Sequence, residues 1–293
     1  MRLLPEPSAQ SLRLVFLLIF VMGVAPSPAL TAGCSDRCVC DDQLVAQCAG
    51  QQLTQFPSDL PLATRQLIIS NNEINDLPAL DLNYLADLIY LDCSNNSLTQ
   101  ISRSTFGNLR KLAYLDLSFN TLTKIEERTF APLISLFMLR MTDNPGLSNI
   151  HPLAFAGNAA LQVLDMSRNN LTTLNVSSLV TLPALRSLGL SGNPLRCDCS
   201  SEDLCMWVQI QSFKFQDEGQ TVCHSPEAMQ GRRLAELGKQ LRADCHRGLD
   251  YWDYLFFTVV GFIIFSAGTI AAWVMGVFMV LCEHYKKSND EDN

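Results

Sequence analysis

The stretch LIYLDCSNNSL, residues 88–98, decides the fold, because LAYLDLSFNTL at residues 112–122 repeats its pattern after 24 residues. In both segments, apolar residues occupy the first, fourth, sixth and eleventh positions, and an asparagine occupies the ninth. Four further copies begin at Leu161, Leu185, Leu136, which carries one extra residue, and Thr64, which replaces a leucine. Self-similarity at a period between about 20 and 50 residues is typical of solenoids. The sequence therefore predicts six stacked repeats of about 24 residues.

A second apolar pair lies in the other half of five repeats, where we expect it to fill the convex side of each coil. The pairs are Leu77 and Leu82, Ile101 and Phe106, Ile125 and Phe130, Ile150 and Phe155, and Leu174 and Leu179. One coil cannot bury both of its faces, so neighbouring coils must stack and the two open ends need caps. The pattern predicts an α/β leucine-rich-repeat solenoid over residues 63–195. The asparagines at the ninth position are expected to satisfy backbone groups of adjacent turns.

Two clusters of cysteines flank the repeats and are expected to lie in the caps. Cys34, Cys38, Cys40 and Cys48 precede the first repeat, and Cys197, Cys199, Cys223 and Cys245 follow the last. Such clusters can bind zinc, but in an extracellular chain they form disulfides far more often. Sequence alone allows three pairings within each set of four. We expect the N-terminal cap over residues 33–62 and the C-terminal cap over residues 196–247.

Three of the eleven cysteines remain outside the two clusters. Cys93 occupies an inward leucine position and is predicted to be a buried thiol. Cys282 lies at the inner edge of the predicted membrane helix, where it is either a palmitoylation site or an inert thiol. Cys205 is either buried beside Trp207 in the cap or available for an intermolecular bridge.

Both ends of the chain carry apolar segments that direct it to a membrane. Residues 1–32 have the layout of a secretory signal peptide, with basic residues, a short apolar run and small residues near a cleavage site. Residues 254–282 contain no charged side chain and are long enough to cross a bilayer. The sequence thus predicts a cleaved signal peptide and one transmembrane α-helix.

The segments around this helix set its expected orientation. Residues 248–253 form a juxtamembrane linker, and residues 283–293 form the tail. Lys286 and Lys287 in the tail agree with the excess of basic residues on the cytoplasmic side of membrane helices. We expect a single-pass type I protein of the plasma membrane with extracellular repeats.

Small residues recur at intervals of four in the predicted helix, at Gly268, Ala272 and Gly276. One helical face therefore lacks bulk and would allow another helix to approach closely. Glycine and alanine are also common in membrane helices in general, so the spacing by itself does not decide between a partner and lipid.

Three sequons lie in repeat positions that we expect to be exposed. Their acceptor residues are Asn95, Asn170 and Asn175. N-glycosylation is expected at each of them, because the signal peptide sends this part of the chain through the secretory route.

Composition narrows the possible functions. The chain is 48% hydrophobic and 17% charged, with a net charge of −8, so it lacks the basic surface that nucleic-acid binding needs. There are four histidines, no phosphate-binding glycine loop and no HExxH zinc motif. We therefore expect no enzyme activity, no metal, no cofactor and no small-molecule substrate.

Residues on the strands that do not point inward face the concave side of such a solenoid and are candidates for binding. The apolar candidates are Tyr90, Tyr114, Phe119, Phe137 and Met138, together with Ile89 and Val163. Exposed apolar clusters are typical of docking surfaces, although tyrosine beside LDLS is also ordinary filling for these repeats. Asp92, Asp116 and Asp165, interrupted by Arg140, form a charge row that we expect to be solvated.

The whole layout resembles the gamma auxiliary subunits of the large-conductance calcium- and voltage-activated (BK) potassium channel. The most specific part is DYLFFTVVGFIIFSAGTIAAWVMGV, residues 253–277, which is similar to the membrane segment of that family. The resemblance implies a partner that binds the pore-forming alpha subunit through its helix and shifts activation to negative voltages. It also implies cap disulfides between Cys34 and Cys40, Cys38 and Cys48, Cys197 and Cys223, and Cys199 and Cys245.

The tail departs from this family in its charge. Strong activators in the family are associated with a basic cluster after the helix, whereas here Lys286 and Lys287 are followed by Asp290, Glu291 and Asp292. We therefore expect a modest gating effect. The alternative interpretation of the chain is an adhesion or ligand-recognition receptor that uses the concave face of its repeats.

Overall fold

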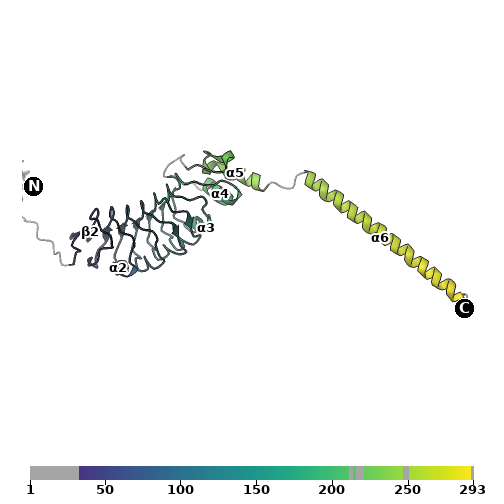
Figure 1. Ribbon diagram of the computed structural model, residues 1–293, viewed down its shortest axis with the longest axis horizontal. Coiled ribbons are helices and arrows are strands. Elements are labelled where there is room, and N and C mark those ends of the chain that lie inside the picture. Colours follow the sequence, from purple (N-terminus) through teal and green to yellow (C-terminus); the bar gives the residue numbers. More distant parts are fainter. Residues whose placement is uncertain (1–32, 211–213, 216–220, 247–250, 292–293) are drawn as a thin grey trace, which may run out of the picture. The chain divides into compact units, whose positions relative to one another are not determined.

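The computed structural model describes residues 33–210, 214–215, 221–246 and 251–291 (Figure 1). The predicted signal peptide lies outside these residues. The chain divides into two units, the first ending at Leu241 and the second beginning at Arg242.

The first unit is a solenoid in which each repeat adds one short strand to a shared sheet (Figure 1). The nine strands follow the order β1-β2-β3-β4-β5-β7-β9-β10-β11 and are parallel, except that β1 pairs with β2 in the antiparallel sense. Their bounds are β1 Val39–Cys40, β2 Val45–Gln47, β3 Gln66–Ile68, β4 Tyr90–Asp92, β5 Tyr114–Asp116, β7 Met138–Arg140, β9 Val163–Asp165, β10 Ser187–Gly189 and β11 Lys214–Phe215. A separate pair joins β6, Lys124–Ile125, to β8, Asn149–Ile150. The predicted leucine-rich-repeat solenoid is confirmed.

The core forms because the middle residue of each strand points inward. Leu67, Leu91, Leu115, Leu139, Leu164 and Leu188 are all fully buried. On the convex side, Phe106, Phe130 and Phe155 stack in sequence, with ring centroids 6.0 and 5.7 Å apart. Each aromatic ring buried in this way contributes a large apolar area to the stability of the stack. These rings belong to the predicted convex pairs.

The convex side is helical only at two places within the described repeats. These are α2, Ala79–Tyr84, and α3, Ser177–Val180. The other described repeats turn through the same region without a helix. A 24-residue repeat leaves few residues on its convex side, and helices shorter than about three turns gain little by themselves.

The ninth-position asparagines bond the backbone of adjacent turns, as predicted. Asn96 Nδ2 donates to Ile69 O in the preceding repeat at 2.9 Å and to Cys93 O at 3.1 Å, while its Oδ1 accepts from Ile74 N at 3.0 Å. Asn120 makes the corresponding bonds one repeat later. Each amide therefore satisfies buried backbone groups that water cannot reach.

The C-terminal cap consists of short helices. They are η1 Cys199–Ser201, α4 Glu202–Ile210, η2 Glu227–Met229 and α5 Leu234–Cys245. Asp198 begins η1 with a capping box, because its side chain accepts from Ser200 N and Ser201 Oγ accepts from Asp198 N. Helices α4 and α5 approach closely at Gly238, where an added Cβ would lie 2.8 Å from Cys205 O.

The second unit contains α6, Tyr251–Glu291. Its segment Tyr251–Glu283 is apolar and long enough to cross a membrane, and its most apolar window is not buried by the described chain. The helix is longer than the predicted residues 254–282, because helical backbone hydrogen bonding continues into the polar residues after the apolar run. Side chains from residue 284 onward lie outside the described part of the chain.

Candidate functional site

Strand register places the predicted concave residues in two rows. Tyr90 pairs with Tyr114, Tyr114 with Met138 and Met138 with Val163. Two residues further along each strand, Asp92, Asp116, Arg140 and Asp165 form the second row. The concave face therefore carries an apolar row beside a charged row, over the same four repeats.

The two tyrosines of the apolar row form one flat aromatic surface. The rings of Tyr90 and Tyr114 are stacked with centroids 4.3 Å apart and planes 4° apart. Burial, reinforced by the charge of Asp116, raises the pKa of the Tyr114 hydroxyl above its usual value. Tyr114 thus remains a neutral donor at physiological pH, and it donates to Asp116 Oδ2 at 3.1 Å.

Two of the four residues in the charged row are buried, against the expectation that the row is solvated. Asp116 and Asp165 are 5% and 6% exposed. Their Oδ1 atoms accept from Ser118 N at 2.9 Å and Ser167 N at 3.1 Å, so each carboxylate closes the turn that follows its strand. Arg140 Nη1 also lies 3.4 Å from Asp116 Oδ2. Asp116 and Asp165 therefore hold the ends of their strands, which explains why these two carboxylates are buried.

The five apolar candidates do not form one patch. Phe137 directly precedes β7 and is 43% exposed, beside the row of Tyr90, Tyr114 and Met138. Phe119 lies beyond the opposite end of the strands, at a positive φ of 55° and 53% exposed. The structure thus brings four of the five residues to one side of the concave face and places Phe119 apart.

Phe119 belongs to a set of residues that directly precede the ninth-position asparagines and share the left-handed backbone conformation. We call this set the left-handed ridge. It consists of Asn71, Asn95, Phe119, Asp143, Arg168 and Gly192, all with φ between 51° and 69°. The sequence does not reveal this set, because the same repeat position is occupied by five different residue types in six repeats and therefore shows no preferred residue.

The cap cysteines are paired in the structure. Cys34 is bonded to Cys40, Cys38 to Cys48, and Cys197 to Cys223. Cys199 and Cys245 are also disulfide-bonded. Cys93 and Cys205 are free and buried, and burial raises the pKa of the Cys205 thiol to about 11. A buried, protonated thiol is a poor candidate for an intermolecular bridge.

The glycosylation candidates are accessible. Asn95, Asn170 and Asn175 are all exposed. Asn95 Nδ2 donates to Asn71 Oδ1 at 2.8 Å, and Asn175 Oδ1 accepts from Ser177 N at 2.9 Å.

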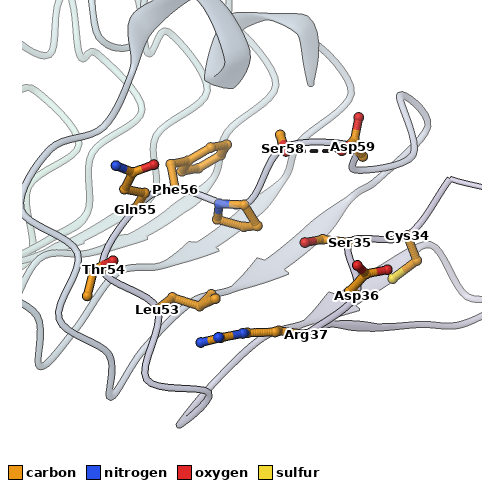
Figure 2. Close-up of a pocket in the computed structure, with 11 residues that line it drawn as sticks. Cys34, Ser35, Asp36, Arg37, Leu53, Thr54, Gln55, Phe56, Ser58 and Asp59 are labelled. Carbon is orange, nitrogen blue, oxygen red and sulfur yellow. Dashed lines mark hydrogen bonds between the residues drawn. The ribbon is translucent and has the colours of Figure 1, made fainter.

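A hollow of about 400 Å³ lies in the N-terminal cap, where sequence analysis singled out nothing (Figure 2). Figure 2 shows Asp36 and Arg37 among its lining side chains, with a hydrogen bond of 3.0 Å between Ser58 Oγ and Asp59 Oδ2. Arg37 is engaged with Gln51 O at 3.4 Å. Among the described residues, no three His, Cys, Asp or Glu side chains come together as metal ligands.

The small-residue face of α6 is open. Gly268, Ala272 and Gly276 are exposed, and a Cβ added at either glycine would meet no atom within 4 Å. A shallow apolar hollow of about 480 Å³ continues this face beside Gly276 and is lined by Trp273, Gly276, Val277, Val280 and Leu281. The tail residues Lys286, Lys287, Asp290, Glu291 and Asp292 have side chains outside the described part of the chain.

Known proteins share this arrangement. A leucine rich repeat family model matches residues 63–120, 87–145 and 143–195. Leucine-rich repeat-containing protein 52 of Mus musculus is 38% identical over 94% of this chain and 87% of its own length. Leucine-rich repeat-containing protein 55 of Mus musculus is 36% identical over 98% of this chain and 96% of its own length. The chain belongs to their family.

The family predicted from the membrane segment and the cap layout is therefore confirmed. The solenoid is also similar to the crystal structure of the TLR13–ssRNA13 complex, with 27% identity and a TM-score of 0.51 over 56% of this chain and 24% of that chain. Within the described residues, one apolar helix and disulfides of the extracytoplasmic kind characterise a single-pass membrane protein.

Proposed function

We propose that the chain is a gamma-type auxiliary subunit of the BK potassium channel, bound to the pore-forming alpha subunit through α6. Membership of the family of leucine-rich repeat-containing proteins 52 and 55 supports this over nearly the whole chain. The observation that carries the proposal is the apolar helix itself. No side chain in its most apolar stretch is buried by the rest of the described chain. Such a surface is covered in a membrane either by lipid or by another helix.

The small-residue face favours another helix. Gly268, Ala272 and Gly276 lie on one side of α6 with nothing packed on them. Without a hydrophobic driving force inside lipid, helices associate through close packing, and small residues permit it. This face is the contact that we assign to the channel.

The binding energy can act on gating only through a difference between states. If α6 contacts the activated voltage sensor better than the resting one, the equilibrium shifts toward activation by that difference. Activation then occurs at more negative potentials. Equal contact with both states would leave the channel unchanged, however tight the complex.

The proposed orientation places the repeats outside the cell and the tail in the cytoplasm, at the plasma membrane. The cap disulfides support this orientation, because they persist in oxidising compartments. The tail carries two lysines and four acidic residues, a net charge of −2. Acidic residues within about 8 Å of the lysines offset their field, so we expect a modest shift that grows when Asp290, Glu291 and Asp292 are neutralised.

The experiment that tests the contact is co-purification of the channel with helix variants. Gly268→Leu and Ala272→Leu add bulk to the small-residue face and are expected to reduce channel capture at least several-fold at equal surface expression. Leu255→Ala, near the outer end of the same helix, is the matched control and is expected to leave capture unchanged. Undiminished capture by both leucine variants would contradict the proposal.

The second candidate is ligand recognition by the concave face. It is favoured by the exposed ring of Phe137 beside the stacked Tyr90 and Tyr114. The two functions differ in where the activity resides. A channel subunit keeps its effect when its repeats are exchanged for those of another protein, whereas a receptor loses its ligand in the same exchange.

A further inference from the structure

Another hollow, of about 240 Å³, lies where the convex side of the last full repeat meets the C-terminal cap. We call it the junction hollow. Its lining comes from two stretches of the chain, residues 173–176 just before α3, and Ser200, Asp203 and Leu204 in η1 and α4. Both stretches belong to the first unit. A group that fills the junction hollow therefore contacts the repeats and the cap together.

The lining combines buried apolar side chains with exposed polar ones. Leu174 and Leu204 are 6% and 2% exposed and belong to the core, whereas Ser200 and Asp203 are exposed. Among the described residues, none donates a hydrogen bond to the Asp203 carboxylate, which accepts readily from hydroxyl and amide groups. Such a lining complements a ligand that has an apolar face and several polar donors.

Asn175 lines the junction hollow itself and is the acceptor of a sequon that ends at Ser177. Its Oδ1 accepts from Ser177 N at 2.9 Å, and no other described residue engages its Nδ2. By contrast, Asn95 Nδ2 donates to Asn71 Oδ1 at 2.8 Å. At Asn175, the nitrogen to which a sugar is attached is therefore free and belongs to a side chain at the edge of an unfilled space.

The volume of the junction hollow suits a single sugar residue. Pockets for drug-sized ligands begin at about 300 Å³, so a branched glycan cannot enter a space of about 240 Å³. The first residue of an N-linked glycan is N-acetylglucosamine, whose ring has apolar C–H groups and whose hydroxyl and acetamido groups donate hydrogen bonds. Its bond to Asn175 places it at the hollow without any further recognition.

We propose that Asn175 carries an N-linked glycan whose first N-acetylglucosamine fills the junction hollow and joins the last full repeat to the C-terminal cap. The ring packs on Leu174 and Leu204, and its polar groups donate to Asp203. Attachment forms a bond between Asn175 Nδ2 and C1 of the sugar, breaks the bond from C1 to a lipid diphosphate, which leaves, and releases one amide proton. The inference rests on the extracellular orientation proposed above, because N-glycans are added on the secretory route.

Mass spectrometry of the full chain tests attachment. The chain is made in cells that leave glycans untrimmed, purified in detergent and treated with endoglycosidase H, which leaves one N-acetylglucosamine at each site. We expect this sugar on Asn175. An unmodified Asn175 beside a modified Asn95 or Asn170 would overturn this inference alone, whereas three unmodified asparagines would also contradict the extracellular orientation.

The thermal midpoint of the same chain tests the packing. Ser177→Ala removes the sequon but retains Asn175 and the backbone N–H that its Oδ1 accepts from, while Ser177→Thr keeps the sequon. Asp203→Ala removes the proposed acceptor, together with a first-turn charge whose loss is common to all backgrounds. We expect Asp203→Ala to lower the midpoint by about 2–4 °C more in the native and Ser177→Thr chains than in the Ser177→Ala chain.

Two controls locate the contact. Thr172→Ala removes the sequon of Asn170, which does not line the junction hollow, and must leave the effect of Asp203→Ala unchanged. Cleavage to a single sugar by endoglycosidase H must leave the difference between the glycosylated and Ser177→Ala chains in place. Equal effects of Asp203→Ala with and without Ser177→Ala, or loss of the difference after cleavage, would overturn the proposal.

Discussion

Asn120 satisfies backbone groups in two successive repeats with one side chain. Its Nδ2 donates to Cys93 O and to Leu117 O, each at 3.1 Å, and its Oδ1 accepts from Leu98 N at 3.0 Å. All of these groups are buried in the solenoid. The Asn120 amide therefore joins the backbones of two neighbouring repeats and stabilises their stacking.

Replacing Asn120 by alanine is expected to be costly. Asn120→Ala leaves a buried N–H and two buried carbonyls with fewer partners, and we expect the free energy of unfolding to fall by about 2–4 kcal/mol. Urea unfolding of the two chains measures the change. Asn75→Ala, at an exposed asparagine, is the control and is expected to change it by less than about 0.5 kcal/mol. Equal changes in the free energy of unfolding for Asn120→Ala and Asn75→Ala would contradict the structural role of the ninth-position asparagines.

The Asp143–Arg168 pair predicts a pH dependence. Arg168 holds the pKa of Asp143 below its ordinary value of 3.8, so the pair stabilises the fold above the unfolded pKa and loses this contribution as pH falls through the folded pKa. Arg168→Ala is expected to cost about 1 kcal/mol at pH 7, because the pair is bidentate but partly exposed. At pH 2 the difference in unfolding free energy should vanish. A difference of the same size at both pH values would rule out the ion pair as its source.

Among individual residues, the sequence alone predicted the role of the ninth-position asparagines and did not reveal the left-handed ridge. The asparagines recur as one residue type at one offset, whereas the left-handed positions are filled by residues as different as Gly192 and Phe119. The burial of Asp116 and Asp165 was also missed, because a carboxylate that caps a turn looks like any exposed aspartate in a sequence. The difference lies in backbone geometry, which the repeat pattern does not encode.

The close approach of helices α4 and α5 depends on Gly238, which has no side chain. A Cβ at Gly238 would lie 2.8 Å from Cys205 O, Met206 Cα and Gln209 Oε1. Lys239 N also donates to Gln209 Oε1 at 2.9 Å, which fixes the two helices at this approach. Two of the three opposing atoms are backbone, so the helices would have to separate to admit a methyl group.

Gly238→Ala is therefore expected to destabilise the cap although alanine is the better helix former. The clash should outweigh the gain of about 1 kcal/mol in helix propensity and lower the free energy of unfolding by about 1–3 kcal/mol. Gln240→Ala on the exposed side of α5 provides the comparison and should be neutral or slightly stabilising. Stabilisation by Gly238→Ala in thermal unfolding would show that the helices are not in contact there.

The repeated strands and the apolar helix could be predicted from the sequence, because periodicity and length are local properties. The convex side could not, since a helix such as α2 and the plain turns of the other repeats use the same apolar pair. The same holds for the length of α6, because hydropathy marks the membrane-spanning part and not the end of the helix. The cap disulfides followed from the family resemblance, since the spacing of the cysteines allows every pairing.

In the whole molecule, the solenoid and the apolar helix α6 differ in how their apolar surfaces are covered. The solenoid has a packed core, satisfied ninth-position asparagines and capped ends, whereas the most apolar window of α6 is not buried by the described chain. The helix is therefore the part of the molecule that lipid or another helix must cover. Its small-residue face is the portion of the molecule that the proposed channel contact would cover.

The conductance–voltage curve of the BK pore subunit, recorded with and without the full chain at matched surface expression, tests the proposed function most directly. We expect a shift to more negative voltages that is reduced by Gly268→Leu and retained when the repeats are exchanged. Superimposable curves with and without the chain, in cells where both proteins reach the surface, would contradict it.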